Sequence, residues 1–290
     1  MSLRPRTVSG VYDDLSHRER RWASTMSGFT ADALATDAPI AARTAHAQPG
    51  PRVGVAAPLS REEREEIEDR LLAPGATRAF GAGNRAREEA PDPRRTCFER
   101  DRDRILHATT FRRLAGKTQV FVFPTDHQRT RLTHALEVAQ VAASIARALR
   151  LNVALTEAIA LGHDCGHGPG GHASEDALSP YIDGGYDHAV WGADVALAEL
   201  NLCAETLDGV RNHSWSRPTP STPEGEVVSW ADRIAYVCHD FEDAVHAGVV
   251  APDMLPAPVA EACGRARRVQ LAAFIDAVVQ STTATGVVSM

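Results

Sequence analysis

The feature that most restricts how this chain can fold is a polar cluster at the end of an apolar helix. Residues 161–172 read LGHDCGHGPGGH, so three histidines and one aspartate fall within ten positions. Upstream, Leu155, Ile159 and His163 recur every four residues, which predicts a helix over 152–161 with His163 on its inward face. Glycines then end the helix and allow a close turn. The cluster predicts a metal or phosphate site; the alternative is a glycine-rich turn whose histidines bind backbone carbonyls.

Cysteine usage narrows the chemistry of such a site. The five cysteines are scattered along the chain and form no CxxC pair. This pattern is typical of a reduced compartment and argues against a thiolate zinc site. Any metal ligands are therefore expected to be nitrogen and oxygen atoms. The cysteines are Cys97, Cys165, Cys203, Cys238 and Cys263.

Charge and hydropathy limit the partners. The net charge of -7 argues against general nucleic-acid binding, although a local basic patch is compatible with an acidic protein. No apolar run approaches the length of a membrane span, and the arginine-rich N-terminus lacks the apolar core of a secretory signal. We therefore expect a soluble cytoplasmic protein without a membrane partner.

The hydrophobic pattern of the sequence changes near residue 95. Residues 1–95 are weakly patterned and are expected to form a partly disordered N-terminal extension, with a linker over 37–60. Ser60 and Glu63 form a capping box that predicts a short helix near 61–72. Residues 96–290 are expected to form a helical core.

Hydrophobic periodicity in that core predicts an all-α fold with at most one short β element. The run 118–123 is β-prone and is closed by Pro124. We find no other convincing strand. The remaining helices are expected over 98–114, 133–149, 186–200, 205–213, 224–246 and 262–280.

Two of these helices carry further polar residues at inward or ambiguous positions. His134 shares a face with the apolar residues of helix 133–149, where an unpaired imidazole is costly. In helix 224–246, three aspartates share one face. This pattern predicts either an ordinary solvent-exposed surface or a nearby cation that relieves the repulsion between the carboxylates. The polar face is expected to hold Asp232, Tyr236, His239, Asp240 and Asp243, and the opposite face Trp230, Ile234, Val237, Phe241 and Val245.

Together these segments offer four ligands for one metal ion. His134, His163, Asp164 and Asp232 supply two imidazoles and two carboxylates. That donor set suits Mn²⁺, Fe²⁺, Mg²⁺ or Zn²⁺ and leaves positions open for water and substrate. A buried histidine–aspartate network without a metal is the simpler alternative.

The order of these motifs resembles the HD-domain phosphohydrolases, and the wider pattern resembles the deoxynucleoside triphosphate triphosphohydrolases, the dGTPase-like branch. The resemblance covers about residues 95–250. HD alone is a weak signal, but several long motifs follow one another in the family's order. They are RDRDRILH at 100–107, FRRLAGKTQVF at 111–121, RTRLTHALEVAQ at 129–140, HDCGHGPGGHASE at 163–175, GGYDH at 184–188 and ADRIAYVCHD at 231–240.

The resemblance implies a role for each motif residue. His134, His163, Asp164 and Asp232 correspond to the metal ligands, and the reaction releases deoxynucleoside and intact triphosphate from a dNTP. His172 and Glu175 correspond to the catalytic His–acid pair, and His188 to a second histidine near the phosphates. Arg131 matches a phosphate-binding arginine, and Arg233 and His167 are placed for a similar role. Gln119, Tyr236 and Asp240 match positions that hold the deoxyribose. A homo-oligomer and a nucleotide effector are also expected.

The sequence departs from the family in three places. Cys165 replaces a bulky apolar residue, and Gly170 often corresponds to a phenylalanine. The family's helical body also extends past the point that corresponds to Met290, so either this is a short version or a C-terminal part is missing. Two other functions therefore stay open: hydrolysis of another nucleotide or phosphoester, and nucleotide or nucleic-acid binding without catalysis.

Overall fold

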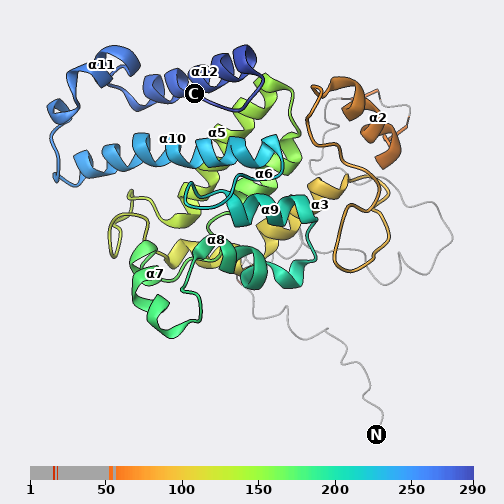
Figure 1. The fold of residues 1–290 in the computed structure, drawn as a ribbon, viewed down its shortest axis with the longest axis horizontal. Coiled ribbons are helices and arrows are strands. Elements are labelled where there is room, and N and C mark those ends of the chain that lie inside the picture. Colours follow the sequence, from red (N-terminus) through yellow and green to blue (C-terminus); the bar gives the residue numbers. More distant parts are fainter. Residues whose placement is uncertain (1–15, 17, 19–51, 55–56) are drawn as a thin grey trace, which may run out of the picture. The chain divides into compact units, whose positions relative to one another are not determined.

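The computed structural model describes residue 16, residue 18, residues 52–54 and residues 57–290 (Figure 1). The chain divides into two compact units after Ala56. The expected linker over 37–60 falls largely outside the described residues. Residues 57–290 form an all-α unit, as predicted. Among the described helices, none combines the length and apolar character needed to cross a membrane.

Three helices form the centre of this unit. They are α5 (Arg131–Leu149), α6 (Val153–Gly162) and α10 (Pro223–His246), which pack against one another. The helix α3 (Cys97–His107) packs on α6, and α12 (Arg267–Thr285) lies along α5 and α10 (Figure 1). Their shared interior is aliphatic, as the periodicity predicts. It includes Val138, Val141, Ile145, Leu155, Ile159, Val227 and Ile234, all fully or almost fully buried.

Shorter helices surround these elements. Most span one or two turns, so they depend on tertiary contacts for stability. They are α2 (Arg61–Leu71), α4 (Thr109–Arg112), α7 (His172–Leu178), α8 (His188–Trp191), α9 (Ala204–Asn212) and α11 (Ala257–Cys263). The 3₁₀ helices are η2 (Arg113–Gly116), η3 (Ser179–Tyr181), η5 (Ala198–Leu200) and η6 (Pro252–Met254), and η4 (Gly192–Ala196) is a π-helix.

The segment 57–95 packs with the helices that come after it in the chain. The predicted capping box of Ser60 and Glu63 is present at the start of α2. The buried Glu224 carboxylate accepts hydrogen bonds from the backbone N–H of Thr77 at 3.0 Å and of Asn152 at 2.9 Å. Because these donors come from distant parts of the sequence, one buried acid ties the segment to α10 and to the start of α6.

The β-prone run 118–123 forms no strand, which agrees with the prediction of at most one short β element. Thr118 makes an isolated bridge to Thr130, and the described residues form no sheet. Phe123 adopts a left-handed backbone with φ of 55° and is 91% exposed. A β-prone segment needs a partner strand for its backbone groups. None lies beside this one in the described region, so it folds as an exposed loop.

Three predicted helices have different limits. The 98–114 helix is interrupted at Ala108, whose backbone is extended, and 262–280 is replaced by α11 and α12, separated by Gly264 with φ of 79°. The 186–200 helix breaks into α8, a π-helix and a 3₁₀ turn. Within this segment, the backbone of Gly192 packs directly against Gly166 in the glycine-rich loop after α6. The two are so close that a Cβ built on Gly166 would lie 2.4 Å from the Gly192 nitrogen. Close backbone packing therefore overrides helix periodicity.

The faces of α10 also differ from the prediction. Val237 is 44% exposed, whereas His239 and Asp243 are buried. His239 Nδ1 lies 3.0 Å from Glu137, and Asp243 pairs with Arg129, so this polar side packs on α5. Buried charges are stable only when paired, and here α5 and the residues before it supply the partners.

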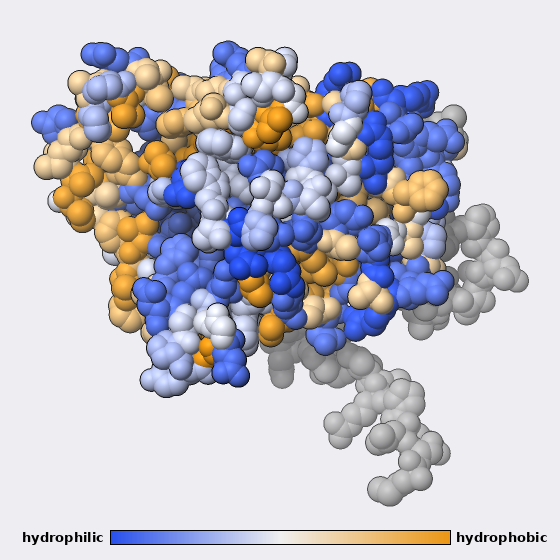
Figure 2. All heavy atoms as spheres, viewed as in Figure 1, coloured by the Kyte–Doolittle hydropathy of each residue, from blue (hydrophilic) through white to orange (hydrophobic). Residues whose placement is uncertain are grey.

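After α10, apolar residues come to the surface. The space-filling view shows hydrophobic side chains gathered near the turn between α10 and α11 (Figure 2). Val249 and Met254, in this turn, are 66% and 65% exposed. The turn thus contrasts with the polar side chains over much of the same view.

Candidate active site

The four predicted metal ligands converge at the centre of the helical unit. His134 lies in the first turns of α5, His163 and Asp164 come directly after α6, and Asp232 lies in α10. His134 Nε2 is 2.9 Å from Asp232 Oδ1. His163 Nε2 is 3.4 Å from Asp164 Oδ1 and 3.7 Å from Asp232 Oδ1. Three helices that pack together thus bring nitrogen and oxygen donors to one point.

The tautomer of His163 shows that this cluster fits a cation. Its Nδ1 lies 2.6 Å from the carbonyl oxygen of Ala160, which only accepts, so Nδ1 carries the hydrogen. In the neutral imidazole, which is the form that binds a metal, Nε2 then carries a lone pair that faces the carboxylates of Asp164 and Asp232. It is buried and has no hydrogen-bond partner among the described residues. A lone pair facing carboxylates is repulsive unless a cation lies between them, and this is the donor arrangement of a histidine–carboxylate metal site.

Both carboxylates are held ionised, although Asp164 is buried and Asp232 is partly buried. Burial raises the pKa of Asp164, but the Arg131 guanidinium and the hydrogen bond with His167 hold the pKa well below its usual range. Arg131 Nη1 donates to Asp164 Oδ2 at 2.8 Å, and both side chains are about 4% exposed. For Asp232, partial desolvation is likewise outweighed by the hydrogen bond with His134, so its pKa is lowered. Ionised carboxylates are the form that binds a divalent cation.

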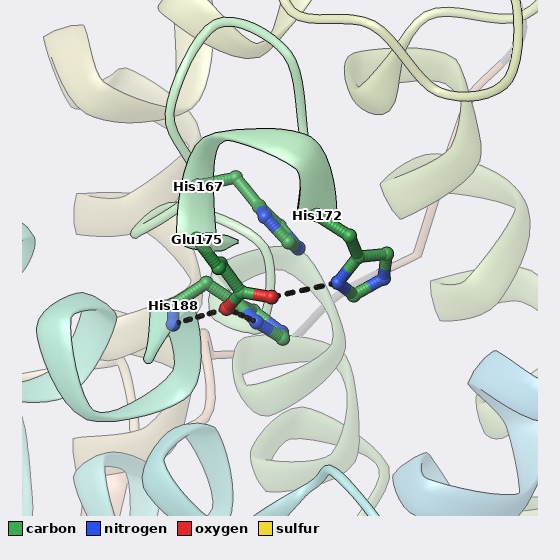
Figure 3. Close-up of side chains that lie close together, drawn as sticks. All are labelled: His167, His172, Glu175 and His188. Carbon is green, nitrogen blue, oxygen red and sulfur yellow. Dashed lines mark hydrogen bonds and ion pairs between the residues drawn. The ribbon is translucent and has the colours of Figure 1, made fainter. Parts of the chain in front are cut away.

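A second cluster is formed by His167, His172, Glu175 and His188 (Figure 3), and its His188 Nε2 lies 4.0 Å from Asp164 Oδ1 of the first cluster. Glu175 in α7 reaches both His172 and His188: its Oε2 lies 2.8 Å from His172 Nδ1 and its Oε1 lies 2.6 Å from His188 Nδ1. The hydrogen bond to Glu175 raises the pKa of His172. His167 stacks on His188 with ring centroids 3.7 Å apart, and burial lowers its pKa to about 3. One carboxylate therefore orients two imidazoles.

Two glycines allow the loop between α6 and α8 to close around these side chains. Gly171 has φ of 62°, and a Cβ there would lie 2.4 Å from Arg131 Nη2. A Cβ on Gly166 would lie 2.0 Å from the backbone oxygen of His188. Any side chain at either position would push the loop away from the arginine or from α8. This is the close turn that the glycine-rich sequence predicts.

The two clusters open onto one pocket of about 390 Å³. Of the residues predicted for the site, His163, His167 and Glu175 do not line this pocket. His163 and Glu175 lie behind the pocket wall and contact residues that line it: His163 faces Asp164, and Glu175 binds His172 and His188. His167 is covered by its neighbours. Those that do line it are Gln119, Arg131, His134, Asp164, His172, His188, Asp232, Arg233, Tyr236 and Asp240.

One wall of the pocket carries hydrogen-bond acceptors that lack a donor. Gln119 Oε1 and Asp240 Oδ1 are buried, and neither has a partner in the described part of the chain. Burial raises the pKa of Asp240 to about 6. Nearby, Arg233 Nη1 donates to the hydroxyl of Tyr236 at 2.7 Å. This wall can accept hydrogen bonds from a ligand hydroxyl.

Four lining residues were not expected from the sequence: His213, Ser214, Trp215 and Ser229. His213, directly after α9, donates from Nδ1 to the Val210 oxygen at 2.8 Å, and its Nε2 lies 3.2 Å from His188 Nε2. Burial lowers the pKa of His213 to about 4. The local signal was a histidine at a helix end with a tryptophan close behind it. Nothing in the spacing links it to His163, whose ring lies 4.9 Å away.

An all-α unit with a His…His-Asp…Asp cluster at the meeting point of its central helices defines an HD-domain protein, and the HD domain model matches residues 131–237. Deoxyguanosinetriphosphate triphosphohydrolase-like proteins show similarity over a longer stretch. The protein from Desulfatibacillum aliphaticivorans is 44% identical over 238 residues, which cover 77% of this chain and 68% of that protein. The chain belongs to this family, which supports a phosphohydrolase.

Other relatives agree with this assignment and define how much of them the chain covers. The protein from Caldanaerobacter subterraneus is 52% identical over 203 residues, which are 68% of this chain and 60% of that protein. A Clostridium perfringens relative is 49% identical over 190 residues, 62% of this chain and 56% of that protein. Both carry the same descriptive name. The chain thus spans little more than half of some relatives.

Proposed function

We propose that this protein is a metal-dependent deoxynucleoside triphosphate triphosphohydrolase. Water attacks the α-phosphorus of a dNTP, and the products are a deoxynucleoside and inorganic triphosphate. The observation that carries the proposal is the buried, unpartnered His163 Nε2, which faces Asp164 and Asp232 beside a pocket lined by Arg131 and Arg233. The names of the relatives support the choice of substrate.

One divalent ion, which Mn²⁺, Mg²⁺, Fe²⁺ or Zn²⁺ could supply, would be held by His134, His163, Asp164 and Asp232. When bound, it supplies charge neutralisation at phosphate and lowers the pKa of a water molecule. The Nδ1–H of His163 is already fixed by the Ala160 carbonyl. That hydrogen bond orients the imidazole, so little reorganisation is needed on metal binding.

The phosphates are assigned to the cationic side of the pocket. A triphosphate carries about four negative charges and needs charged donors. Arg131 and Arg233 line the pocket, and Arg131 Nε is buried without a partner within the described region. His167 was expected to help, but its low pKa leaves it neutral near pH 7. Because His167 also does not line the pocket, it is assigned to Asp164, 3.2 Å from its Nε2, and not to the phosphates.

His172 is assigned as the proton donor to the leaving 5′ oxygen, and His188 shares this role. Glu175 holds both rings and favours the protonated form of His172. The deoxyribose is placed against Tyr236, with its 3′-hydroxyl donating to Gln119 or Asp240. The two unpartnered oxygens on this wall support the placement.

Product analysis tests the reaction. The protein is incubated with each dNTP and Mn²⁺ or Mg²⁺, and the products are separated by anion exchange. Deoxynucleoside and intact triphosphate in equal amounts are expected. Release of phosphate or pyrophosphate would indicate a different phosphohydrolase. Thermal stabilisation by dNTP without turnover would indicate a nucleotide-binding protein without catalysis.

Assembly and location complete the proposal. We expect a homo-oligomer in the cytoplasm whose activity responds to a nucleotide effector. Light scattering after gel filtration, with and without dNTP, measures the subunit number. A monomer under all conditions, with no change in rate on adding a second dNTP, would contradict this part alone.

The pH profile tests the role of Glu175. Glu175→Gln is expected to lower kcat by about 10- to 100-fold, within the range of general acid–base catalysis. A proton donor must be protonated, so activity falls as the pH rises through its pKa. Because Glu175 raises the pKa of His172, the variant should lose activity at a lower pH than the wild type. The measurement is kcat from pH 5 to 10.

The neighbouring residue supplies the control for this experiment. Asp176 also lies in α7, is exposed, and has no polar side-chain contact in the region the structure describes. Asp176→Asn removes the same charge one residue away and should leave the profile unchanged. An alkaline limb that stays in place in Glu175→Gln would show that Glu175 does not set the protonation of the donor.

A further inference from the structure

Arg233 differs from the other arginine that lines the candidate active-site pocket, because no carboxylate holds it. Arg131 donates to Asp164, whereas Arg233 has no ion pair in the described part of the chain. Its Nη1 donates to the Tyr236 hydroxyl at 2.7 Å. A guanidinium carries five N–H donors, so others remain for a ligand. An arginine side chain is flexible, however, and needs a partner that keeps it at the pocket.

Trp215 supplies that partner. The Cζ atom of Arg233 lies 4.2 Å from the centroid of the Trp215 ring and 5.1 Å from that of the Tyr236 ring. The negative face of an aromatic ring attracts a cation within about 6 Å, and tryptophan attracts it most strongly. A ring face does not neutralise the charge as a carboxylate does. The Trp215 contact therefore holds Arg233 and leaves its positive charge available to an anion.

Trp215 is itself supported by Trp230. The two rings meet at 73° with centroids 5.0 Å apart, which is the edge-to-face geometry that aromatic pairs favour. Trp230 is half-buried, packs against the hydrophobic core and lies three residues before Arg233 on α10. Residues at this spacing are neighbours on one helix face. The core thus fixes Trp230, which contacts Trp215, which in turn contacts Arg233.

The loop that carries Trp215 is attached to α9 near both of its ends. It spans residues 213–222, between α9 and α10. His213 donates to a carbonyl oxygen of α9 at 2.8 Å, and the backbone N–H of Ser221 donates to Asp208 at 2.7 Å. The Trp215 side chain is 53% exposed, so it contributes little to the core. Its replacement should therefore change the contact with Arg233 and leave the fold intact.

We propose that Trp215 is a positioning residue that holds Arg233 ready to bind the phosphates of the substrate. The inference rests on the proposed function, which places the phosphates against Arg233. A side chain that is ordered only on binding reduces affinity, whereas one that is already ordered avoids this cost. Trp215 lies outside the motifs that resemble the dNTP triphosphohydrolases, and the mechanism proposed above gives it no role.

Binding of inorganic triphosphate to the metal-loaded protein, measured by isothermal titration calorimetry, tests this role without turnover. Trp215→Leu keeps an apolar side chain but removes the ring. It should weaken binding by about 2- to 10-fold, the usual cost of ordering one flexible side chain. Trp215→Phe, which keeps a ring face, should recover most of the affinity. Phe80→Ala, at an aromatic residue that is 85% exposed, is the control and should bind triphosphate like the wild type.

A double-mutant cycle distinguishes positioning of Arg233 from a general structural effect. Arg233→Ala alone should weaken triphosphate binding by about tenfold or more, because charge-assisted hydrogen bonds are lost. If Trp215 acts through Arg233, Trp215→Leu should cause no further loss in the Arg233→Ala background. Equal losses in both backgrounds, or no loss from Trp215→Leu in the wild type, would overturn the inference. A wild type that does not bind triphosphate would overturn it as well.

Steady-state kinetics gives a second readout. Because Arg233 is assigned to the phosphates in the bound substrate and in the transition state alike, Trp215→Leu should raise the KM for dNTP by about 2- to 10-fold and change kcat little. A lower kcat with an unchanged KM would indicate a disturbed catalytic centre and contradict the positioning role. If the binding cycle gives the expected coupling but the wild type releases no triphosphate from dNTP, the proposed function fails and the role of Trp215 stands.

Discussion

Replacement of Asp164 by alanine is expected to abolish metal binding and to reduce hydrolysis by about 10³-fold or more, since the ion supplies several kcal/mol of charge stabilisation. Asp164 is the most connected residue of the site. Its Oδ1 lies 3.4 Å from His163 Nε2 and 3.2 Å from His167 Nε2, and its Oδ2 accepts from Arg131. Its removal would take one proposed ligand from the ion and the only ion-pair partner that the buried Arg131 has within the described chain.

Metal content, measured by plasma mass spectrometry, and triphosphate release report these two losses separately. Asp164→Asn keeps the shape of the side chain and an acceptor for Arg131, so it should fold like the wild type and still lose the metal. Asp183→Asn, at an exposed residue, is the matched control. Retention of a full equivalent of metal by Asp164→Asn would show that the four side chains do not bind one ion.

A chain with alanine in place of Asp101 is expected to be less stable by about 3–5 kcal/mol, the usual cost of breaking a buried ion pair. Asp101 is fully buried, and its Oδ1 accepts from Arg85 Nη1 at 2.5 Å. Its Oδ2 accepts from the backbone of Cys203 at 2.8 Å and from Thr206 at 2.7 Å. Without the carboxylate, a guanidinium that is 2% exposed loses its buried partner and two donors lose their acceptor.

Asp103, two residues along the same helix, is the matched control. Its carboxylate pairs with Arg95 at 3.0 Å, but the Arg95 side chain is 48% exposed. Exposed pairs contribute about 0–1 kcal/mol, so Asp103→Ala should change the free energy of unfolding by less than about 1 kcal/mol. Urea unfolding at pH 7 measures both variants. Equal losses would show that burial of the Asp101 pair does not determine its effect.

The helices that could be predicted were those whose signals are local. Leu155, Ile159 and His163 repeat at helical spacing, and Asn152 caps the helix through its side chain. Ser60 and Glu63 form their capping box with no help from distant residues. Spacing and caps act within one or two turns, so the sequence displays them directly.

Errors arose where distant backbone sets the structure. The 186–200 segment has an acceptable helical pattern, but its middle lies against Gly166 and unwinds. The β-prone 118–123 segment, where at most one short strand was predicted, forms none because no partner strand lies beside it in the described region. On α10, Val237 faces solvent and His239 is buried. The polar side of α10 packs on α5, where Glu137 pairs with His239, and Arg129, just before α5, pairs with Asp243. Periodicity shows that two faces differ, but not which one is covered.

The amino-acid sequence alone determined the helical class, the chemistry of the donors and the tight turn behind His163, because each of these depends on residue type and short-range spacing. Tertiary structure alone decided that His213 and Trp215 line the pocket, that His167 is covered, and that Glu175 holds two histidines at once. These features depend on contacts between segments tens of residues apart. Their distances are set by how α5, α6, α9 and α10 pack, which no local pattern encodes.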